Sequence, residues 1–492
     1  MSGLSPVIGF GGNGSYRDEN RSLIEDPSPT PSPALSDFFS SQHFKFYRFP
    51  GGTESRTYLY DAPDLIKSAT DQYNAFLVGL NDGESHNTLN YPGKNVRSYD
   101  QFLAEAQRDQ LTPIFVLNDW FYHDATTVYP LFDLNFKIAG TDPAATWTAM
   151  LNGIAKQVWH THQILGPNAV LYWEIGNEDH HVLPASLYGT IVQKFTDQIR
   201  KVFPQDKIIF AIAGADETSS VPAGWNTDLF NTLKASHTLQ YLSFASPHIY
   251  LHYDEEITTT DADAVTKFFR ISNVYSRMKD ENALLGSYPN ISLFPTEFGI
   301  FRGVRNRNYN TQFEGLLMFY YLMQLNAAPN LTNAIRHAMY TENVGLFYTG
   351  PAYEDLVENN PGIYLSSYAN PKRFFTYLPP SATAARKFLE RNAYKASSFT
   401  LNDTWAYTQT ILDAEVQINL VNFGLSPLKI KFTDLAGDLC KAPATPTVYQ
   451  YGFDSLDLHD WAGGSAVSKP TTGSIIISPS TYSFMSLPRC PP

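Results

Sequence analysis

The sequence predicts an α/β fold, a (β/α)8 TIM barrel followed by a C-terminal antiparallel β-sandwich. Strand-like apolar runs alternate with helical stretches about eight times over the first roughly 390 residues, a pattern typical of parallel strands joined by crossover helices. The runs are continuously apolar, as expected for strands buried on both faces. We expect a barrel domain at 1–394 and a sandwich domain at 395–492, to which part of the N-terminal segment can belong.

The barrel strands are expected at short continuous apolar runs, in chain order. They cover residues 6–10, 44–49, 113–117, 170–175, 207–213, 241–245, 291–295 and 335–340, with a further strand-like run at 75–80. Helices are expected at 98–110, 144–165, 185–202, 311–327 and 382–391, the last of which closes the domain. An open doubly wound sheet is the alternative, but no Gly-x-Gly-x-x-Gly or P-loop motif opens a helix after a strand.

The C-terminal region changes to alternating apolar and polar residues separated by turn residues. This alternation is typical of antiparallel strands with one buried face, and it covers 405–421, 428–432, 447–451 and 474–487. The chain's two cysteines, Cys440 and Cys490, both fall in this region. A single pair leaves a disulfide and two free thiols equally open.

Composition excludes several classes of function. The net charge of −13 opposes nucleic-acid binding, which needs a basic surface. No apolar run is long enough to span a bilayer, so we expect no membrane insertion. No Cys/His cluster has zinc-ligand spacing, and we expect neither metal nor cofactor. The N-terminus lacks a signal-peptide pattern. We expect a secreted or periplasmic protein whose signal is absent from this chain, with a cytoplasmic location as the alternative.

Two short motifs carry the chemistry. Tyr-Trp-Glu-Ile-Gly-Asn-Glu at 172–178 and Phe-Pro-Thr-Glu-Phe-Gly at 294–299 each lead from a strand-like run into a glutamate. In a (β/α)8 barrel, the carboxyl ends of the strands face the active site. Paired carboxylates are what glycosidic bond cleavage needs, because one protonates the leaving oxygen while the other attacks the anomeric carbon or activates water.

These motifs resemble the retaining glycoside hydrolases of clan A. In that clan the fourth strand ends in Asn-Glu, whose Glu is the general acid/base, and the seventh ends in the nucleophilic Glu. The resemblance therefore implies that Glu178 is the acid/base and Glu297 the nucleophile. Arg-Phe-Pro-Gly-Gly at 48–52, His-Ile-Tyr at 248–250 and the segment 477–483 make the layout similar to family 51 arabinofuranosidases and related families, without resolving one family.

Supporting roles follow from the chemistry of the neighbouring side chains. Asn177 is suited to bond a sugar 2-hydroxyl, or else is a turn residue. Arg48 is expected to keep Glu297 ionised by charge and hydrogen bonding. Tyr250 is expected to bond the same carboxylate while His248 lines the floor, although packing explains both residues nearly as well. Glu178 must be protonated to act as an acid, so we expect burial and the second carboxylate to raise its pKa.

Several further residues have less specific signals. Glu174 shares a strand face with Glu178 and is expected to be structural. Trp120 and Tyr340 are candidate sugar platforms, with loop anchoring an equal alternative, and Tyr340 stands where many clan A enzymes have Trp. Three arginines follow the second motif, and they suggest either a solvated loop or a clamp for a carboxylate or sulfate. They are Arg302, Arg305 and Arg307.

We therefore predict a retaining O-glycoside hydrolase that works by double displacement without a cofactor. Its expected partner is a plant or algal cell-wall polysaccharide or oligosaccharide, with α-L-arabinofuranosidase or endo-β-glycanase activity. A glucuronidase-like or sulfated-glycan hydrolase is the alternative enzyme. A non-catalytic carbohydrate-binding barrel is the alternative of another class, and the presence of both glutamates opposes it. An aldolase is also opposed, because no Schiff-base lysine stands at a strand end. Oligomeric state is left open.

Overall fold

The computed structural model describes the elements that carry both motifs. The described residues are 9–13, 45–52, 55, 58–60, 77–78, 99–119, 143–214, 221–253, 273–302, 312–337, 395–402, 404–412, 415–424, 426–431, 448–452, 474–479 and 481–488. Trp120, Tyr340, both cysteines, Arg305, Arg307 and the helix expected at 382–391 lie outside these residues, as does the side chain of Arg302.

The main sheet is parallel throughout, as predicted. Its ten strands run in the order β10 (Ser292–Leu293), β8 (Phe244–Ser246), β7 (Lys207–Ala211), β6 (Tyr172–Ile175), β5 (Thr112–Leu117), β2 (Phe46–Phe49), β1 (Gly9–Asn13), β12 (Asn333–Arg336), β11 (Phe298–Arg302) and β9 (Ile249–Tyr253). The run expected at 75–80 is not in this sheet. It contains β4 (Leu77–Val78), which pairs with β3 (Tyr58–Leu59) in a separate two-stranded sheet.

Two strands are interrupted at proline. The expected strand at 241–245 begins as a 3-10 turn, η4 (Leu239–Tyr241), continues as β8, and resumes as β9 after Pro247 and His248. The expected strand at 291–295 is shorter than predicted: β10 ends at Leu293, and the chain rejoins the sheet as β11 only after Pro295. Proline has no backbone N–H to donate to a ladder, so each strand breaks there. The first break holds His248, and the second holds Thr296 and Glu297 of the second motif.

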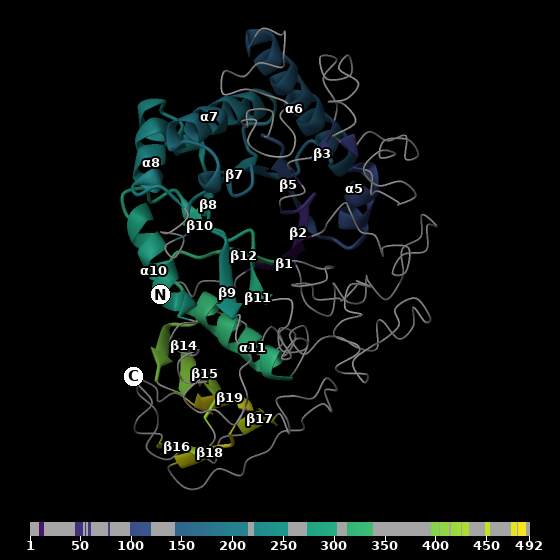
Figure 1. The fold of residues 1–492 in the computed structure, drawn as a ribbon. Helices are drawn as coiled ribbons and strands as arrows, with labels where there is room; N and C mark the ends of the chain where they lie inside the picture. Colours follow the sequence, from purple (N-terminus) through teal and green to yellow (C-terminus); the bar gives the residue numbers. More distant parts are fainter. Residues whose placement is uncertain are drawn as a thin grey trace, which may run out of the picture.

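Helices lie around the outside of these strands (Figure 1). They are α5 (Tyr99–Arg108), α6 (Pro143–Leu165), α7 (Ala185–Val202), α8 (Trp225–Ala235), α10 (Val274–Leu285) and α11 (Gln312–Ala327). In α7, Tyr188, Ile191, Phe195 and Ile199 recur at helical spacing and are fully buried. Burial of each such side chain contributes about 1.5–3 kcal/mol.

Tyr188 also fixes the ends of two strands. Its hydroxyl donates to the carbonyl oxygen of Ile175 at 2.7 Å and accepts from the amide of Ala211 at 2.8 Å. These residues end β6 and β7, so one helical side chain fastens the point where the first motif leaves the sheet. Strands β2, β5, β7 and β12 each contribute one side chain to a small buried cluster, which is made of Phe46, Ile114, Ile209, Phe294 and Ile335.

The C-terminal region forms antiparallel sheets, as its alternating pattern predicts. Five strands pair in the order β13 (Ser398–Leu401), β14 (Trp405–Ile411), β15 (Glu415–Asn422), β19 (Thr481–Pro488) and β17 (Val448–Gly452). β16 (Leu428–Lys431) pairs with β18 (Ser474–Ile477) in a second sheet. Side chains from both sheets share one buried cluster, which includes Ile418, Ile430, Ile475 and Met485.

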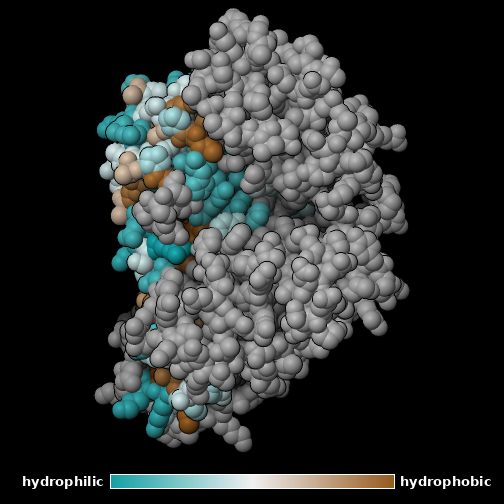
Figure 2. Space-filling model, in the orientation of Figure 1, coloured by the Kyte–Doolittle hydropathy of each residue, from teal (hydrophilic) through white to brown (hydrophobic). Residues whose placement is uncertain are grey.

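Helix α11 joins the two regions. Its residues from Phe319 to Leu325 are buried, and the C-terminal strands lie beside it in Figure 1. Tyr321 stacks on Phe298, and Phe319 stacks on Tyr482. Among the described residues, no helix combines the length and apolar content that crossing a bilayer requires. On the face in Figure 2, the described surface mixes hydrophilic residues with small hydrophobic patches.

Candidate active site

The candidate functional side chains gather where the parallel strands reach their carboxyl ends. Arg48 lies in β2, and Glu174 lies in β6. Glu178 follows β6, while His248 and Glu297 occupy the two strand breaks. Ligands of parallel α/β sheets bind at this edge because the loops that follow the strands meet there. Residues up to 249 positions apart are thereby brought into direct contact.

The turn after β6 determines where Glu178 points. Gly176 has a φ of 69°, and a Cβ atom at this position would collide with the carboxylates of Asp179 and Asp119. Glu178 itself has φ 54° and ψ 37°, in the left-handed region that non-glycine residues rarely occupy. The turn therefore holds a strained residue at a strand end, an arrangement that is common at functional sites.

Arg48 is the centre of a buried ion network. Its Nε and Nη2 atoms donate to the two carboxylate oxygens of Glu174, at 2.6 and 2.9 Å. Its Nη1 atom donates to Oε1 of Glu297 at 2.7 Å, and Nη2 also donates to Oδ1 of Asn177 at 2.9 Å. Burial alone would lower the pKa of Arg48, but the two carboxylates raise it. The predicted contact between Arg48 and Glu297 is present in the structure.

Glu297 is held as a carboxylate. Tyr250 donates its hydroxyl proton to Oε2 at 2.5 Å, and the Nδ1 atoms of His248 and His337 each lie 3.5 Å from that oxygen. Burial by itself would raise the pKa of Glu297, but His248, His337 and Arg48 together with the tyrosine hydrogen bond lower it well below 4.5. An ionised, hydrogen-bonded oxygen is the state a nucleophile needs.

Glu178 is the more accessible of the two motif glutamates. Its side chain is 25% exposed, against 4% for Glu297, and its Oε1 atom lies 2.9 Å from Nδ1 of His248. The sequence predicts a raised pKa for Glu178, and the structure shows the reverse. Burial and the Glu297 carboxylate do raise it, but the hydrogen bond and charge of His248 lower it further, and the pKa is lowered overall.

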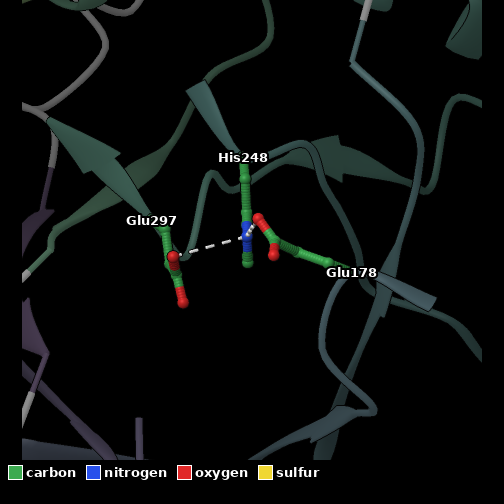
Figure 3. A group of neighbouring side chains, drawn as sticks. All are labelled: Glu178, His248 and Glu297. Carbon is green, nitrogen blue, oxygen red and sulfur yellow. Dashed lines mark hydrogen bonds and ion pairs between the residues drawn. The ribbon is translucent and has the colours of Figure 1, made fainter. Parts of the chain in front are cut away.

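His248 lies between the two carboxylates, as Figure 3 shows. Burial would lower its pKa, but Glu297, Glu174 and Glu178 raise it to about 10. One ligand-type atom from each of Glu178, His248 and Glu297 lies within 4.8 Å of the others, a spacing that also suits a metal ion. The guanidinium of Arg48 already bonds Glu297, and the imidazole of His248 already bonds Glu178.

The sequence reasoning missed three residues of the site. His337 follows β12 and contacts Glu297, whereas the sequence pattern had indicated Tyr340 as the site residue of that strand. Thr296 and Ser246 hydrogen-bond each other beneath His248. The signal for Thr296 was its place next to Glu297, and nothing in the sequence marked Ser246. Glu174, expected to be structural, is bonded to Arg48 and Thr296.

Comparisons with known proteins support the layout. No family model matches the chain, and no curated protein matches it. Several solved structures do match the chain. The family 51 arabinofuranosidase of Xanthomonas axonopodis pv. citri gives a TM-score of 0.63 at 11% identity, over 99% of this chain and 98% of that one. The family 51 α-L-arabinofuranosidase of Bifidobacterium longum gives 0.62 at 12% identity, over 99% and 97%.

A family 39 glycoside hydrolase from Bacteroides cellulosilyticus WH2 gives a TM-score of 0.55 at 13% identity, over 98% of this chain and 81% of that one. The chain thus has the fold of these clan A glycoside hydrolases over nearly its whole length. Several families match alike, so the likeness does not select one of them.

Proposed function

We propose that this protein is a retaining O-glycoside hydrolase in which Glu297 is the nucleophile and Glu178 the general acid/base. The observation that carries the proposal is the pairing of two motif carboxylates in different environments. One oxygen of Glu178 lies within 4.8 Å of an oxygen of Glu297. Retaining enzymes have carboxyl groups about 5–5.5 Å apart, whereas inverting enzymes need about 6.5–9.5 Å to admit a water molecule.

The environments suit the two roles. Glu297 is buried, ionised and fixed by Arg48 and Tyr250, so it can attack the anomeric carbon without rearranging. Glu178 is partly exposed and hydrogen-bonded to a protonated histidine, so it has access to a proton for the leaving oxygen. In the second step Glu178 accepts a proton from water, which attacks the glycosyl–enzyme ester and releases Glu297.

The proposal includes a closed (β/α)8 barrel. β8 and β9 are parts of one interrupted strand, and so are β10 and β11, which makes eight strand segments among the described residues. The strand order starts on β10 and β8 and ends on β11 and β9, so it returns to the same two segments. Leu293 of β10 also bridges in parallel to Leu331, just before β12. These contacts favour closure.

For the C-terminal region we propose a β-sandwich domain at 395–492, with the barrel at 1–394. The buried cluster shared by the two antiparallel sheets favours a face-to-face arrangement. For the substrate we propose a plant or algal cell-wall polysaccharide or oligosaccharide, cleaved as an α-L-arabinofuranoside or an internal β-glycosidic bond.

A hydrolysis screen tests the proposed function. Aryl glycosides and cell-wall polysaccharides are incubated with the wild-type chain, with Glu297→Gln and with Asp280→Asn, a carboxylate removal on the exposed face of α10. We expect turnover of at least one substrate by the wild type and by Asp280→Asn, and a loss of about a thousandfold or more in Glu297→Gln. Wild-type turnover that survives in Glu297→Gln would refute the assignment.

A further inference from the structure

The hydroxyl of Thr296 lies beneath the catalytic pair and has three hydrogen-bond partners. Its Oγ1 atom is 2.6 Å from Oε1 of Glu174, 2.6 Å from Oγ of Ser246, and 3.2 Å from Nε2 of His248. All four side chains are buried, so water does not compete for these bonds. A threonine hydroxyl offers one donor and two acceptor sites, and the three contacts fill all of them.

The direction of each bond follows from its partners. Glu174 is ionised, because the fork of Arg48 outweighs its burial and lowers its pKa, so it accepts the proton of Thr296. The Oγ atom of Ser246 accepts from the backbone amide of Thr296 at 3.0 Å, which leaves its own proton for Oγ1 of Thr296. The third partner, Nε2 of His248, must therefore also donate. Nε2 carries a hydrogen in every protonation state of the ring that keeps these contacts.

This restriction leaves Nδ1 as the only ring nitrogen of His248 that can gain or lose a proton. Nδ1 faces Oε1 of Glu178 at 2.9 Å. Either Nδ1–H donates to the Glu178 carboxylate, or a protonated Glu178 donates to bare Nδ1. Both arrangements place one transferable proton at this contact.

We propose that Thr296, held by Glu174 and Ser246, is a positioning residue that fixes His248 as an Nε2–H donor and thereby makes His248 and Glu178 a two-residue store for the catalytic proton. This inference rests on the proposed role of Glu178 as the general acid. It goes beyond that role because the acid proton resides on a histidine that does not touch the leaving group.

The proton transfers balance over the two steps. When the glycosidic bond breaks, the one proton held between Nδ1 of His248 and Glu178 passes through Glu178 to the leaving oxygen, which leaves Glu178 as a carboxylate. His248 remains neutral with its Nε2 hydrogen. In the second step the attacking water gives a proton to Glu178, which returns it to Nδ1. The bond from Glu297 to the anomeric carbon forms in the first step and breaks in the second.

The groups that face His248 set the pH range of this store. Glu178, Glu297 and Glu174 surround it, with Nε2 of the ring 3.9 Å from the nearest Glu174 oxygen. Arg48 supplies the opposing positive charge through its bonds to Glu174 and Glu297. His337 lies on the far side of Glu297, and burial lowers its pKa, so it adds little positive charge near neutrality.

Histidine NMR tests the tautomer directly and needs no substrate. In a chain labelled with 15N at histidine, the His248 signals are identified by their loss in His248→Gln. We expect Nε2 to stay protonated at every pH at which the protein is folded, with only Nδ1 titrating. In Thr296→Val, Nε2 should no longer stay protonated over the whole pH range, and its signal should change with pH. Titration of Nε2 in the wild type, or an unchanged spectrum in Thr296→Val, would overturn the inference.

Kinetics supply the functional test on whichever glycosides the wild type hydrolyses. Thr296→Val should slow substrates with alkyl or sugar leaving groups by about ten- to a hundredfold, and should affect activated aryl glycosides much less, because good leaving groups need little protonation. Thr296→Ser should restore the rate. Thr196→Val is the matched control, since it removes a buried hydroxyl on α7 that has no hydrogen-bond partner among the described residues.

The two hypotheses fail in different ways. Equal slowing of both substrate classes by Thr296→Val, or no recovery of the rate in Thr296→Ser, would contradict the proton store. Neither result would affect the proposed glycosidase function. A wild-type chain that hydrolyses no glycoside would refute the proposed function, whatever the histidine spectrum shows.

Discussion

The Nη1 atom of Arg48 lies 2.7 Å from Oε1 of Glu297, with both side chains buried. The Nε and Nη2 atoms of the same guanidinium bind Glu174 through two hydrogen bonds. One cation is therefore shared by two buried carboxylates from different strands, so the shape of the site and its protonation depend on the same residue.

Replacement of Arg48 should be costly to stability. Arg48→Met leaves Glu174 and Glu297 buried without their cation, and we expect the free energy of unfolding to fall by about 3–5 kcal/mol. Arg200→Met is the control, because the Arg200 guanidinium donates to the backbone carbonyl oxygen of Pro204 and lies over the Tyr241 ring, and its loss should cost about 1 kcal/mol or less. Denaturant unfolding of both variants measures the difference, and equal losses would contradict the importance of the network.

Removal of the Tyr250 hydroxyl should shift the acid limb of the pH–rate profile. The hydroxyl donates to Glu297 and helps to lower the pKa of that carboxylate. Tyr250→Phe should therefore raise the pKa of Glu297, move the acid limb of kcat/KM toward higher pH, and lower the rate by about tenfold. An acid limb that stays in place would show that the hydrogen bond does not control Glu297.

Stability should depend on pH through the same network. The pKa values of Glu174 and Glu297 are lowered on folding, so their contribution is present above pH 4.5 and is lost as the pH falls through their lower folded values. The pKa of His248 is raised from 6.5 to about 10, so its contribution is complete below 6.5 and is lost as the pH rises toward 10.

The substitution His248→Gln isolates the alkaline part of this dependence. The variant should lose stability relative to the wild type at neutral pH, and the difference between the two should shrink as the pH rises toward 10. Thermal unfolding across the pH range measures it. A difference that grows with pH would mean that His248 is neutral in the folded protein.

Gly176→Ala should disrupt the turn that carries Glu178. A Cβ atom would collide with the Asp179 carboxylate, and a φ of 69° costs a non-glycine residue about 1–2 kcal/mol even without a collision. Gly166→Ala is the matched control, since its φ is 104° but no atom of the described residues lies within 4 Å of the added Cβ. We expect Gly176→Ala to lower the melting temperature more than Gly166→Ala does. Only Gly176→Ala should lose activity.

Much of this arrangement is predictable from local sequence. The continuous apolar run before Glu178 marks β6, and the spacing of buried residues in α7 marks a helix whose predicted bounds match those observed. The resemblance to clan A led to Arg48, Tyr250 and His248, and the structure places all three against the motif glutamates. Their catalytic roles remain predictions.

Other features depend on contacts between distant segments. The lowered pKa of Glu178 could not be predicted without knowing that Nδ1 of His248 lies 2.9 Å from it, across 70 positions of sequence. The strand breaks at Pro247 and Pro295 follow from proline chemistry, yet the resumption as β9 and β11 depends on pairing with each other. Ser246 is an ordinary serine until the fold places it against Thr296.

Azide rescue tests the central claim most directly, because it assigns a role to each glutamate separately. Glu297→Ala and Glu178→Ala are each supplied with an activated aryl glycoside and azide, and NMR gives the anomeric configuration of the glycosyl azide formed. If Glu297 is the nucleophile, azide replaces it in Glu297→Ala and the product is inverted. If Glu178 is the acid/base, azide attacks the glycosyl–enzyme in Glu178→Ala and the product keeps the substrate's configuration. The opposite pair of configurations, or no azide product from either variant, would contradict the account.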